Sequence, residues 1–165
     1  MKKTEIDAFD AGLSFACAYK ELLEKYDLRI NDQDTSGYVL LISLVTNGCL
    51  SAELYLKYLL GSYPKTHRLS ELKKCLAASR RELWKQVEKM AIEVMKNRYL
   101  NIDYCEEKFE NDLIQFDDAF CEWRYFFEYN EKAENKVYNL DFLTAFLLSL
   151  EAICTLEHSY SNSDL

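Results

Sequence analysis

One proline and four glycines occur in this chain of 165 residues, and their scarcity limits the folds open to it more than any other feature. Tight turns, collagen-like repeats and disordered segments all draw heavily on these two residue types. Disorder and an all-β sandwich are therefore disfavoured. Hydrophobic residues make up 49% of the chain, and a chain of this length can bury roughly 70% of its unfolded surface. We expect a single all-α domain over residues 1–165.

Apolar periodicity predicts about six helices in an up-and-down bundle and gives no convincing strand. The expected helices cover residues 4–26, 38–60, 69–77, 79–98, 105–130 and 140–158. The second of them is apolar nearly all round, which is typical of a central, buried helix. Gly61 fits a C-terminal cap for it, and Pro64 prevents its continuation. Residues 29–37 read as a loop, and the tail at residues 159–165 is expected to fray.

Two further patterns concern the fourth and fifth helices. Ser79, with Glu82 three residues later, has the spacing of a capping box and predicts the start of the fourth helix. An aromatic seam runs along the fifth, in steps of four and three residues: Phe109, Leu113, Phe116, Phe120, Trp123 and Phe127. Such a seam can pack along a partner helix, either in the core or in a dimer.

The net charge of −8 argues against a dedicated duplex-DNA binder, which needs a cationic face. The charge is unevenly spread, because residues 65–98 hold ten bases and four acids, a net charge of +6, and the remainder carries −14. Arg81, Lys85 and Lys89 recur every four residues and so line one helix face. This stripe has two interpretations, a phosphate-contacting surface for RNA or nucleotide and an ordinary solvated helix face.

The N-terminal residues predict a cytoplasmic protein, because acids interrupt any apolar stretch that a secretory signal would need. The most apolar windows, residues 38–45 and 142–150, are shorter than the roughly 20 residues that span a bilayer, so no membrane contact is expected. The six cysteines include no CxxC pair and are expected to be mostly small core residues. We predict no metal and no cofactor.

Common signatures of nucleotide-dependent and metal-dependent enzymes are absent from the sequence, so attention falls on polar residues within apolar helices. Glu53 and Lys57 are four residues apart and share a helix face, as do Arg124 and Glu128 within an aromatic segment. Burying such charges is costly unless they are paired, which predicts a cross-helix ion-pair cluster. The alternative is a groove site in which Arg124 binds a phosphate. His67 is either a surface acid or base, or a ring that hydrogen-bonds at a helix start.

Three segments together resemble the HEPN superfamily of compact α-helical bundles: NGCLSAELYLKYLL at residues 47–60, THRLSELKKCL at 66–76 and FDDAFCEWRYFFE at 116–128. The shared pattern is an apolar helix bearing Glu and Lys, a His-x-Leu turn, and a later aromatic-Arg-Tyr helix. The resemblance covers residues 38–150. It implies a homodimer in which the late helix of each subunit lines a shared cleft. It also implies metal-independent RNase activity in toxin–antitoxin or phage-defence systems, often beside a nucleotidyltransferase.

The chain departs from the HEPN nuclease motif, in which His follows Arg after four to six intervening residues. Counted from Arg124, that spacing reaches Tyr129, Asn130 and Glu131, and none of these is a histidine. Asn130 can orient a hydroxyl group of an RNA or nucleotide, but it cannot exchange a proton near neutral pH. The standard proton-transfer mechanism is therefore in doubt.

The leading hypothesis is accordingly a HEPN-like, non-catalytic binding or regulatory component of a bacterial stress or defence system. A second hypothesis is a metal-independent RNase with a rearranged site, in which Arg124 binds phosphate and His67 or Glu128 handles the proton. A third is a nucleotide-binding or small-molecule module beside Glu53, Lys57 and Arg124. A helical dimerisation or adaptor module remains a further alternative.

Overall fold

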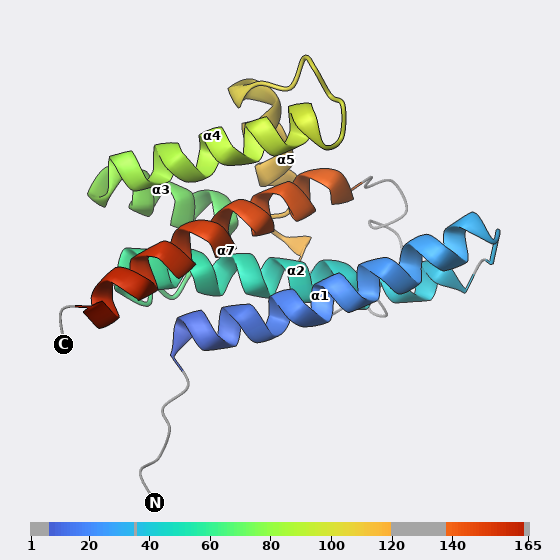
Figure 1. Ribbon diagram of the computed structural model, residues 1–165, viewed down its shortest axis with the longest axis horizontal. Coiled ribbons are helices and arrows are strands. Elements are labelled where there is room, and N and C mark those ends of the chain that lie inside the picture. The colour runs from blue at the N-terminus through green and yellow to red at the C-terminus, as the bar shows by residue number, and fades with distance from the viewer. Residues whose placement is uncertain (1–6, 35, 120–137, 164–165) are drawn as a thin grey trace, which may run out of the picture.

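The computed structural model describes residues 7–34, 36–119 and 138–163. Within these ranges the chain forms α-helices and no strand, so the predicted all-α bundle is confirmed (Figure 1). The helices are α1 (Ala8–Asn31), α2 (Gly37–Leu60), α3 (Leu69–Ser79), α4 (Arg81–Asn97), α5 (Glu106–Gln115) and α7 (Leu140–Ser163).

The long helices run alternately up and down around α2. Helices α1 and α2 form an antiparallel hairpin, and α7 lies across both α2 and α4 (Figure 1). Of the short helices, α3 packs against α2 and α4, and α5 packs against α3 and α4. The start of α1 and the end of α7 meet at one end, where the rings of Phe9 and His158 stack with centroids 4.5 Å apart. The hydroxyl of Tyr58 on α2 lies 3.3 Å from His158 Nδ1 at the same place.

Helix α2 is the central helix that its composition predicts. Leu44, Val45 and Leu56 on it are fully buried. Gly48 sits where α1 and α7 both approach, because a Cβ there would lie 2.7 Å from Leu143 Cδ2 and 3.0 Å from Tyr19 Cδ2. The absence of a side chain at Gly48 therefore allows three long helices to pack closely.

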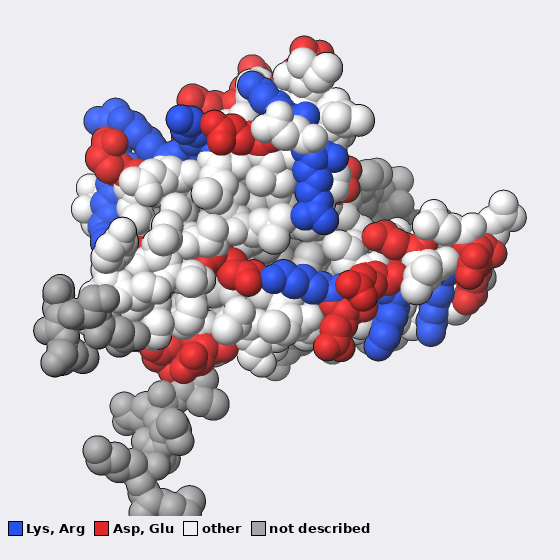
Figure 2. Space-filling view, viewed as in Figure 1, with Lys and Arg blue, Asp and Glu red and all other residues white. Residues whose placement is uncertain are grey.

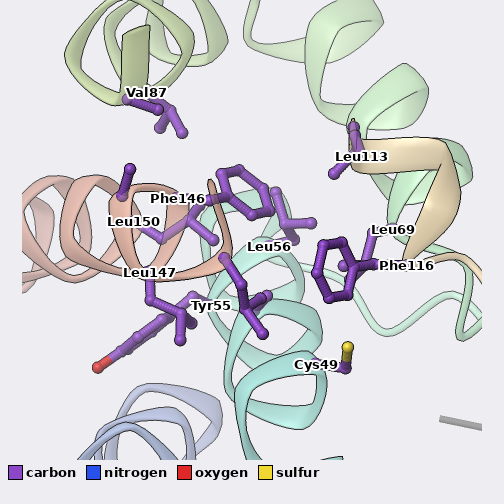
Figure 3. Packing of buried hydrophobic residues seen from close by; sticks show 14 of the residues in the cluster. Cys49, Tyr55, Leu56, Leu69, Val87, Leu113, Phe116, Phe146, Leu147 and Leu150 are labelled. Carbon is purple, nitrogen blue, oxygen red and sulfur yellow. The ribbon is translucent and has the colours of Figure 1, made fainter. Parts of the chain in front are cut away.

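Aromatic rings fill the space between α4, α5 and α7. The ring of Phe109 on α5 meets Phe142 and Phe146 of α7 edge-on, at centroid distances of 5.2 and 5.7 Å. Edge-to-face pairs at such distances are favoured by the ring quadrupoles. Figure 3 shows Phe146 between Val87 of α4 and Leu56 of α2. Phe116, also from the predicted aromatic seam, is buried in the same cluster, whereas Phe120, Trp123 and Phe127 lie outside the described residues.

The predicted helix over residues 105–130 is wrong in its extent, because α5 ends at Gln115. The backbone N–H of Phe116 bonds to Leu113 O at 3.1 Å, so the last turn tightens and the chain leaves the helix. The turn that follows places Asp117 against the start of α3. A contact with another element thus ends α5 at a point where the apolar pattern continues.

The start of the fourth helix is also not the predicted one. Ser79 is the last residue of α3, and its hydroxyl donates to Cys75 O at 2.8 Å instead of capping α4. Arg80 occupies the junction between the two helices. Its guanidinium donates to Leu59 O at 2.9 Å and to Glu157 of α7 at 2.5 Å, so it ties this corner to α2 and α7.

Two helix ends extend beyond their predicted limits. Helix α1 continues to Asn31, into the segment expected to be a loop, and the N–H of Asp32 bonds to both Leu28 O and Ile30 O. Helix α7 continues to Ser163, through most of the tail expected to fray. The hydroxyls of Ser159 and Ser161 donate to carbonyls one turn earlier, which satisfies those groups within the helix.

Helix α2 also meets a length and composition test for crossing a membrane. Its segment Val39–Leu60 has 22 residues and a mean hydropathy of 1.6, so the expectation that no window is long enough is wrong by this measure. Half of the apolar window is buried inside the bundle. The central helix of a soluble protein passes the same test, so the finding is compatible with a soluble protein.

The cysteines depart in part from the predicted core role. Cys49 and Cys154 are buried, whereas Cys17, Cys75 and Cys105 are exposed. Cys121 lies outside the described residues. The exposed thiols sit on α1, on α3 and directly before α5.

Candidate functional site

The turn before α3 is fixed by hydrogen bonds that reach across the bundle. Asp117, which follows α5, accepts from the backbone N–H of Ser70 at 2.7 Å and also from the Ser70 hydroxyl. Within the turn, Thr66 Oγ1 accepts from the N–H of Arg68 at 3.2 Å. These bonds satisfy donors that a helix start leaves without intrahelical partners. They also fix the backbone on either side of His67.

Glu53, Lys57 and His67 meet in what we call the Glu53 cluster. Lys57 Nζ lies 2.7 Å from Glu53 Oε1 along one face of α2, as the four-residue spacing predicts. His67 Nδ1 lies 3.0 Å from Glu53 Oε1 and 3.1 Å from Oε2. The cluster therefore joins the central helix to the turn before α3.

Burial makes this pairing necessary. Glu53 is only 5% exposed and Lys57 only 8% exposed, and either charge alone would be costly at that depth. The side chain of His67, by contrast, is 53% exposed. Burial, with a further contribution from the Glu53 carboxylate, raises the pKa of the neighbouring Cys49 far above its ordinary value, so this thiol stays protonated. The cluster has a buried ionic part and an accessible imidazole.

The remaining residues of the predicted site cannot be placed. Arg124, Glu128 and Asn130 lie outside the described residues. The structure thus brings together the Glu, the Lys and the His of the predicted set. The cross-helix cluster links α2 to a turn, and its relation to the aromatic-Arg-Tyr segment stays a prediction.

The basic stripe of α4 lies along a groove of about 780 Å³ between α4 and the start of α5. Lys85 and Lys89 are part of its wall, together with Lys96, and Arg81 is exposed one turn before Lys85 and outside the lining. Four glutamates share the same groove: Glu88, Glu93, Glu106 and Glu107. Three lysines thus face four glutamates, so the groove does not present the net positive surface that a phosphate chain prefers.

Glu88 shows the electrostatic effect of this arrangement. Its partial burial raises the pKa of its carboxyl, and the charges of Glu106 and Glu110 raise it further. The nearby Lys73 acts in the opposite direction but does not cancel the rise. Acids therefore dominate this part of the groove at neutral pH.

Two other grooves lie in the described part of the chain. One, of about 310 Å³, runs between α1 and α7 beside Tyr19 and Thr144, and the other, of about 600 Å³, lies beside Asp112 and Asn139. None of the three grooves is lined by the Glu53 cluster. The cluster therefore lies apart from these hollows.

Sequence reasoning missed a second, partly buried polar network. Asp112 on α5 accepts from the Tyr104 hydroxyl at 2.6 Å and from the Asn139 side chain at 2.9 Å, and Asn139 in turn accepts from the N–H of Phe142. Burial and the bond to Asp112 raise the pKa of Tyr104 well above its ordinary value. Asn139 directly before the apolar run of α7 has the character of an N-cap, and that signal was available in the sequence.

Comparison of the chain with protein-family models, with curated proteins and with solved structures finds no match. The helical architecture is compatible with a HEPN-like domain.

Proposed function

We propose that this chain is a HEPN-like bundle that acts by binding rather than by cleavage, as a regulatory component of a bacterial stress, toxin–antitoxin or phage-defence system. Two of the segments that resemble the superfamily meet in the Glu53 cluster. The observation that carries the proposal is the sharing of Glu53 Oε1 between Lys57, at 2.7 Å, and His67, at 3.0 Å.

This sharing favours a structural role for the cluster. The ammonium of Lys57 neutralises the carboxylate that orients the ring, and the three groups tie α2 to the turn before α3. Paired charges of this kind stabilise a fold mainly by avoiding the cost of an unpaired one. The proposed partner is a protein, such as the nucleotidyltransferase that the HEPN resemblance implies.

A cleavage assay tests the proposal directly. Purified full-length chain would be incubated with a panel of labelled single-stranded and hairpin RNAs, with and without a chelator. We expect no cleavage, and we expect His67→Gln to behave as the wild type. One result would contradict the proposal: the wild-type chain cleaves RNA, and His67→Gln and Arg124→Ala both lose this cleavage although each variant keeps its helical circular dichroism.

RNA binding without cleavage can be tested separately. The test changes the glutamates that line the groove beside the α4 stripe. We expect weak, salt-sensitive binding of a single-stranded RNA. Replacing Glu106 and Glu107 by glutamine should tighten that binding by about 3- to 10-fold, since local charge of the opposite sign concentrates a polyanion. Glu24→Gln, on α1 and away from this groove, is the matched control. Equal affinities for all three proteins would rule out RNA contact at the stripe.

One observation favours a second candidate function, a metal-independent RNase with a rearranged site. The half-exposed ring of His67 has its Nδ1 held by Glu53 at 3.0 Å. A carboxylate in that position fixes the orientation and tautomer of an imidazole, and the other ring nitrogen would then exchange a proton with a 2′-hydroxyl or leaving oxygen. Arg124 would stabilise the phosphoryl charge.

The two candidates differ in their response to Glu53→Gln. If the RNase assignment holds, this variant lowers kcat and leaves KM nearly unchanged, because Glu53 would position His67 without touching RNA. If the binding assignment holds, Glu53→Gln reduces stability alone. A pH–rate profile that loses its histidine limb in His67→Gln would support the RNase.

A further inference from the structure

The groove of about 310 Å³ between α1 and α7, which we call the α1–α7 groove, has an apolar floor. Leu147 and Leu148 of α7 line it, together with Ala16 and Leu23 of α1. This volume lies at the lower end of the range for small-molecule sites, in which an apolar surface takes a hydrocarbon group and a few polar groups orient it. Figure 2 shows this side of the molecule, where charged side chains along α1 face basic side chains at the end of α4 across the uncharged surface of α7.

The buried hydroxyls of this groove offer acceptors rather than donors. Tyr19 and Thr144 both line the groove, and their hydroxyl oxygens lie 2.7 Å apart. Leu140 O lies 2.9 Å from Thr144 Oγ1 and 3.4 Å from the Tyr19 hydroxyl, so either arrangement of the protons bonds both of them within the protein. Burial raises the pKa of Tyr19 far above its ordinary value, which keeps the phenol neutral. A ligand that contacts these oxygens must therefore bring its own N–H or O–H donor.

Two carboxylates stand at the rim of the groove without a counter-ion. Glu24 and Asp27 of α1 both line it, and neither forms an ion pair within residues 7–34, 36–119 and 138–163. Burial, with a further contribution from the Asp27 carboxylate, raises the pKa of the neighbouring Asp141. A ligand that brings a positive charge to this rim would relieve the repulsion between these acids.

The rim also carries an arginine that has no carboxylate partner in the described part of the chain. Arg98 follows the last residue of α4 and lines the groove, with its Cζ 5.7 Å from the centre of the Tyr99 ring. The other cation of the groove, Lys20, is already paired with Glu151 at 2.8 Å. A guanidinium presents a planar fork of N–H donors that binds a carboxylate through two parallel hydrogen bonds. Arg98 is therefore the group to which a negatively charged part of a ligand would bind.

Taken together, these groups match a molecule that carries an ammonium, a carboxylate and a hydrocarbon side chain. The rim carboxylates and the Tyr19 oxygen accept from an ammonium, and Arg98 donates to a carboxylate. The leucines of the floor provide the apolar surface for the side chain. A phosphate ester or a nucleotide fits less well, because the unpaired acids at the rim outnumber the unpaired cation.

We propose that the α1–α7 groove binds a small zwitterionic amino acid with an apolar side chain. Arg98 binds its carboxylate, Glu24 and Asp27 bind its ammonium, and the floor packs against its side chain. The groove includes neither the Glu53 cluster nor the basic stripe of α4. The inference therefore goes beyond the proposed function, and it holds whether the protein binds RNA, cleaves it or does neither.

L-Leucine is the probe, and two molecules that each lack one of its charged groups are its controls. Isoamylamine keeps the ammonium and the side chain, and isocaproate keeps the carboxylate and the side chain. The full chain would be titrated with each molecule and followed by heteronuclear NMR of the backbone amides. We expect L-leucine to bind with a Kd of about 0.1–1 mM, in keeping with its small size, and to shift amides of α1 and α7 beside the groove. Each control should bind about 10-fold more weakly, because it loses a charged hydrogen bond.

Variants at the rim separate the two charged contacts. Arg98→Gln should weaken the binding of L-leucine by about 10-fold and leave that of isoamylamine unchanged. Glu24→Gln combined with Asp27→Asn should weaken the binding of L-leucine and isoamylamine but not that of isocaproate. Arg81→Gln is the matched control, since Arg81 is exposed on α4 and outside the groove lining. All four positions are exposed, so each variant should keep its fold, which circular dichroism checks.

Each outcome decides the proposal. Weaker binding of L-leucine to Arg98→Gln but not to Arg81→Gln, with amide shifts confined to the groove, supports it. The proposal is overturned if L-leucine causes no shift at about 10 mM, a concentration well above the expected Kd. It is equally overturned if the shifts lie elsewhere, or if the wild type and Arg98→Gln bind L-leucine with the same affinity.

Discussion

Glu53 connects the central helix α2 to the turn before α3. Its carboxylate is nearly inaccessible, yet it accepts from an ammonium on its own helix and an imidazole on the following turn. Removing one member of a buried pair leaves the other charge without compensation, which costs more than the pair itself contributes. The cluster therefore makes a sharp prediction about stability.

Glu53→Gln should lower the free energy of unfolding by about 3 kcal/mol, because Lys57 stays buried without its counter-ion. Urea unfolding followed by circular dichroism measures this change. The double variant Glu53→Leu with Lys57→Met removes both charges and should lose less than about 1 kcal/mol. Equal losses in the two variants would show that packing, and not charge, is what matters here.

Glu88 gives a prediction about pH. Its pKa is raised in the folded state above the ordinary value of 4.5, so the folded state binds its proton more readily than the unfolded state does. Ionisation of Glu88 therefore lowers the free energy of unfolding as the pH rises through the pKa that this carboxyl has in the folded state. Glu88→Gln should stabilise the protein at pH 7, by no more than about 0.5 kcal/mol because solvent screens a half-exposed group.

Below the ordinary value of 4.5 the carboxyl is protonated in both states, and the advantage of Glu88→Gln should disappear. Thermal melts from pH 3.5 to 7 would show the effect as a difference in Tm that grows with pH. Glu82→Gln, at an exposed position paired with Lys85, is the control and should show no such gain.

At the scale of the elements, the start of α3 depends on a residue from another helix. Asp117→Ala removes the acceptor for the N–H and hydroxyl of Ser70 and should cost about 1–2 kcal/mol, as loss of a helix cap does. Asp118→Ala removes only an exposed pair with Arg68 at 3.2 Å and should cost less than about 0.5 kcal/mol. Hydrogen exchange of the α3 amides would report the same order. A similar loss in both variants would contradict the assigned cap.

Helices whose ends are set by local signals could be predicted from the sequence, and helices whose ends are set by contacts with other elements could not. Helix α2 was predictable because its apolar residues dominate every local signal, and Gly61 marks its end with a φ of 64°. The end of α5 was not predictable from the sequence. Asp117, just after this helix, caps α3 by accepting from the N–H of Ser70, which lies 47 residues earlier in the chain. The prediction that Ser79 caps the fourth helix is wrong, because the hydroxyl of Ser79 bonds within α3.

The candidate site also has one part that the sequence predicts and another part that it does not. The four-residue spacing of Glu53 and Lys57 predicts their ion pair, since one helix fixes it. The approach of His67 to Glu53 depends on how the turn folds back over α2, which no local pattern encodes. The basic stripe is visible in the sequence, but Glu106 and Glu107, which line the same groove from α5, are brought to it only by the tertiary structure.

At the scale of the whole molecule, the homodimer that the HEPN resemblance implies should make the stability depend on the protein concentration. Dimerisation stabilises the folded state by mass action, so raising the protein concentration from about 2 to about 200 μM should raise Tm by about 2–6 °C. Differential scanning fluorimetry measures Tm at each concentration. A constant Tm for the wild type would argue against any dimer in this range.

The stacked rings of Phe9 and His158 have one more consequence. Because they bring the beginning of α1 beside the end of α7, a short linker can join the two ends of the described bundle. New ends can then be opened in the loop between α4 and α5, where Leu100 and Ile102 are exposed. The order of the helices along the chain is therefore separable from their arrangement in space, and a circular permutant would retain the core with a rearranged sequence.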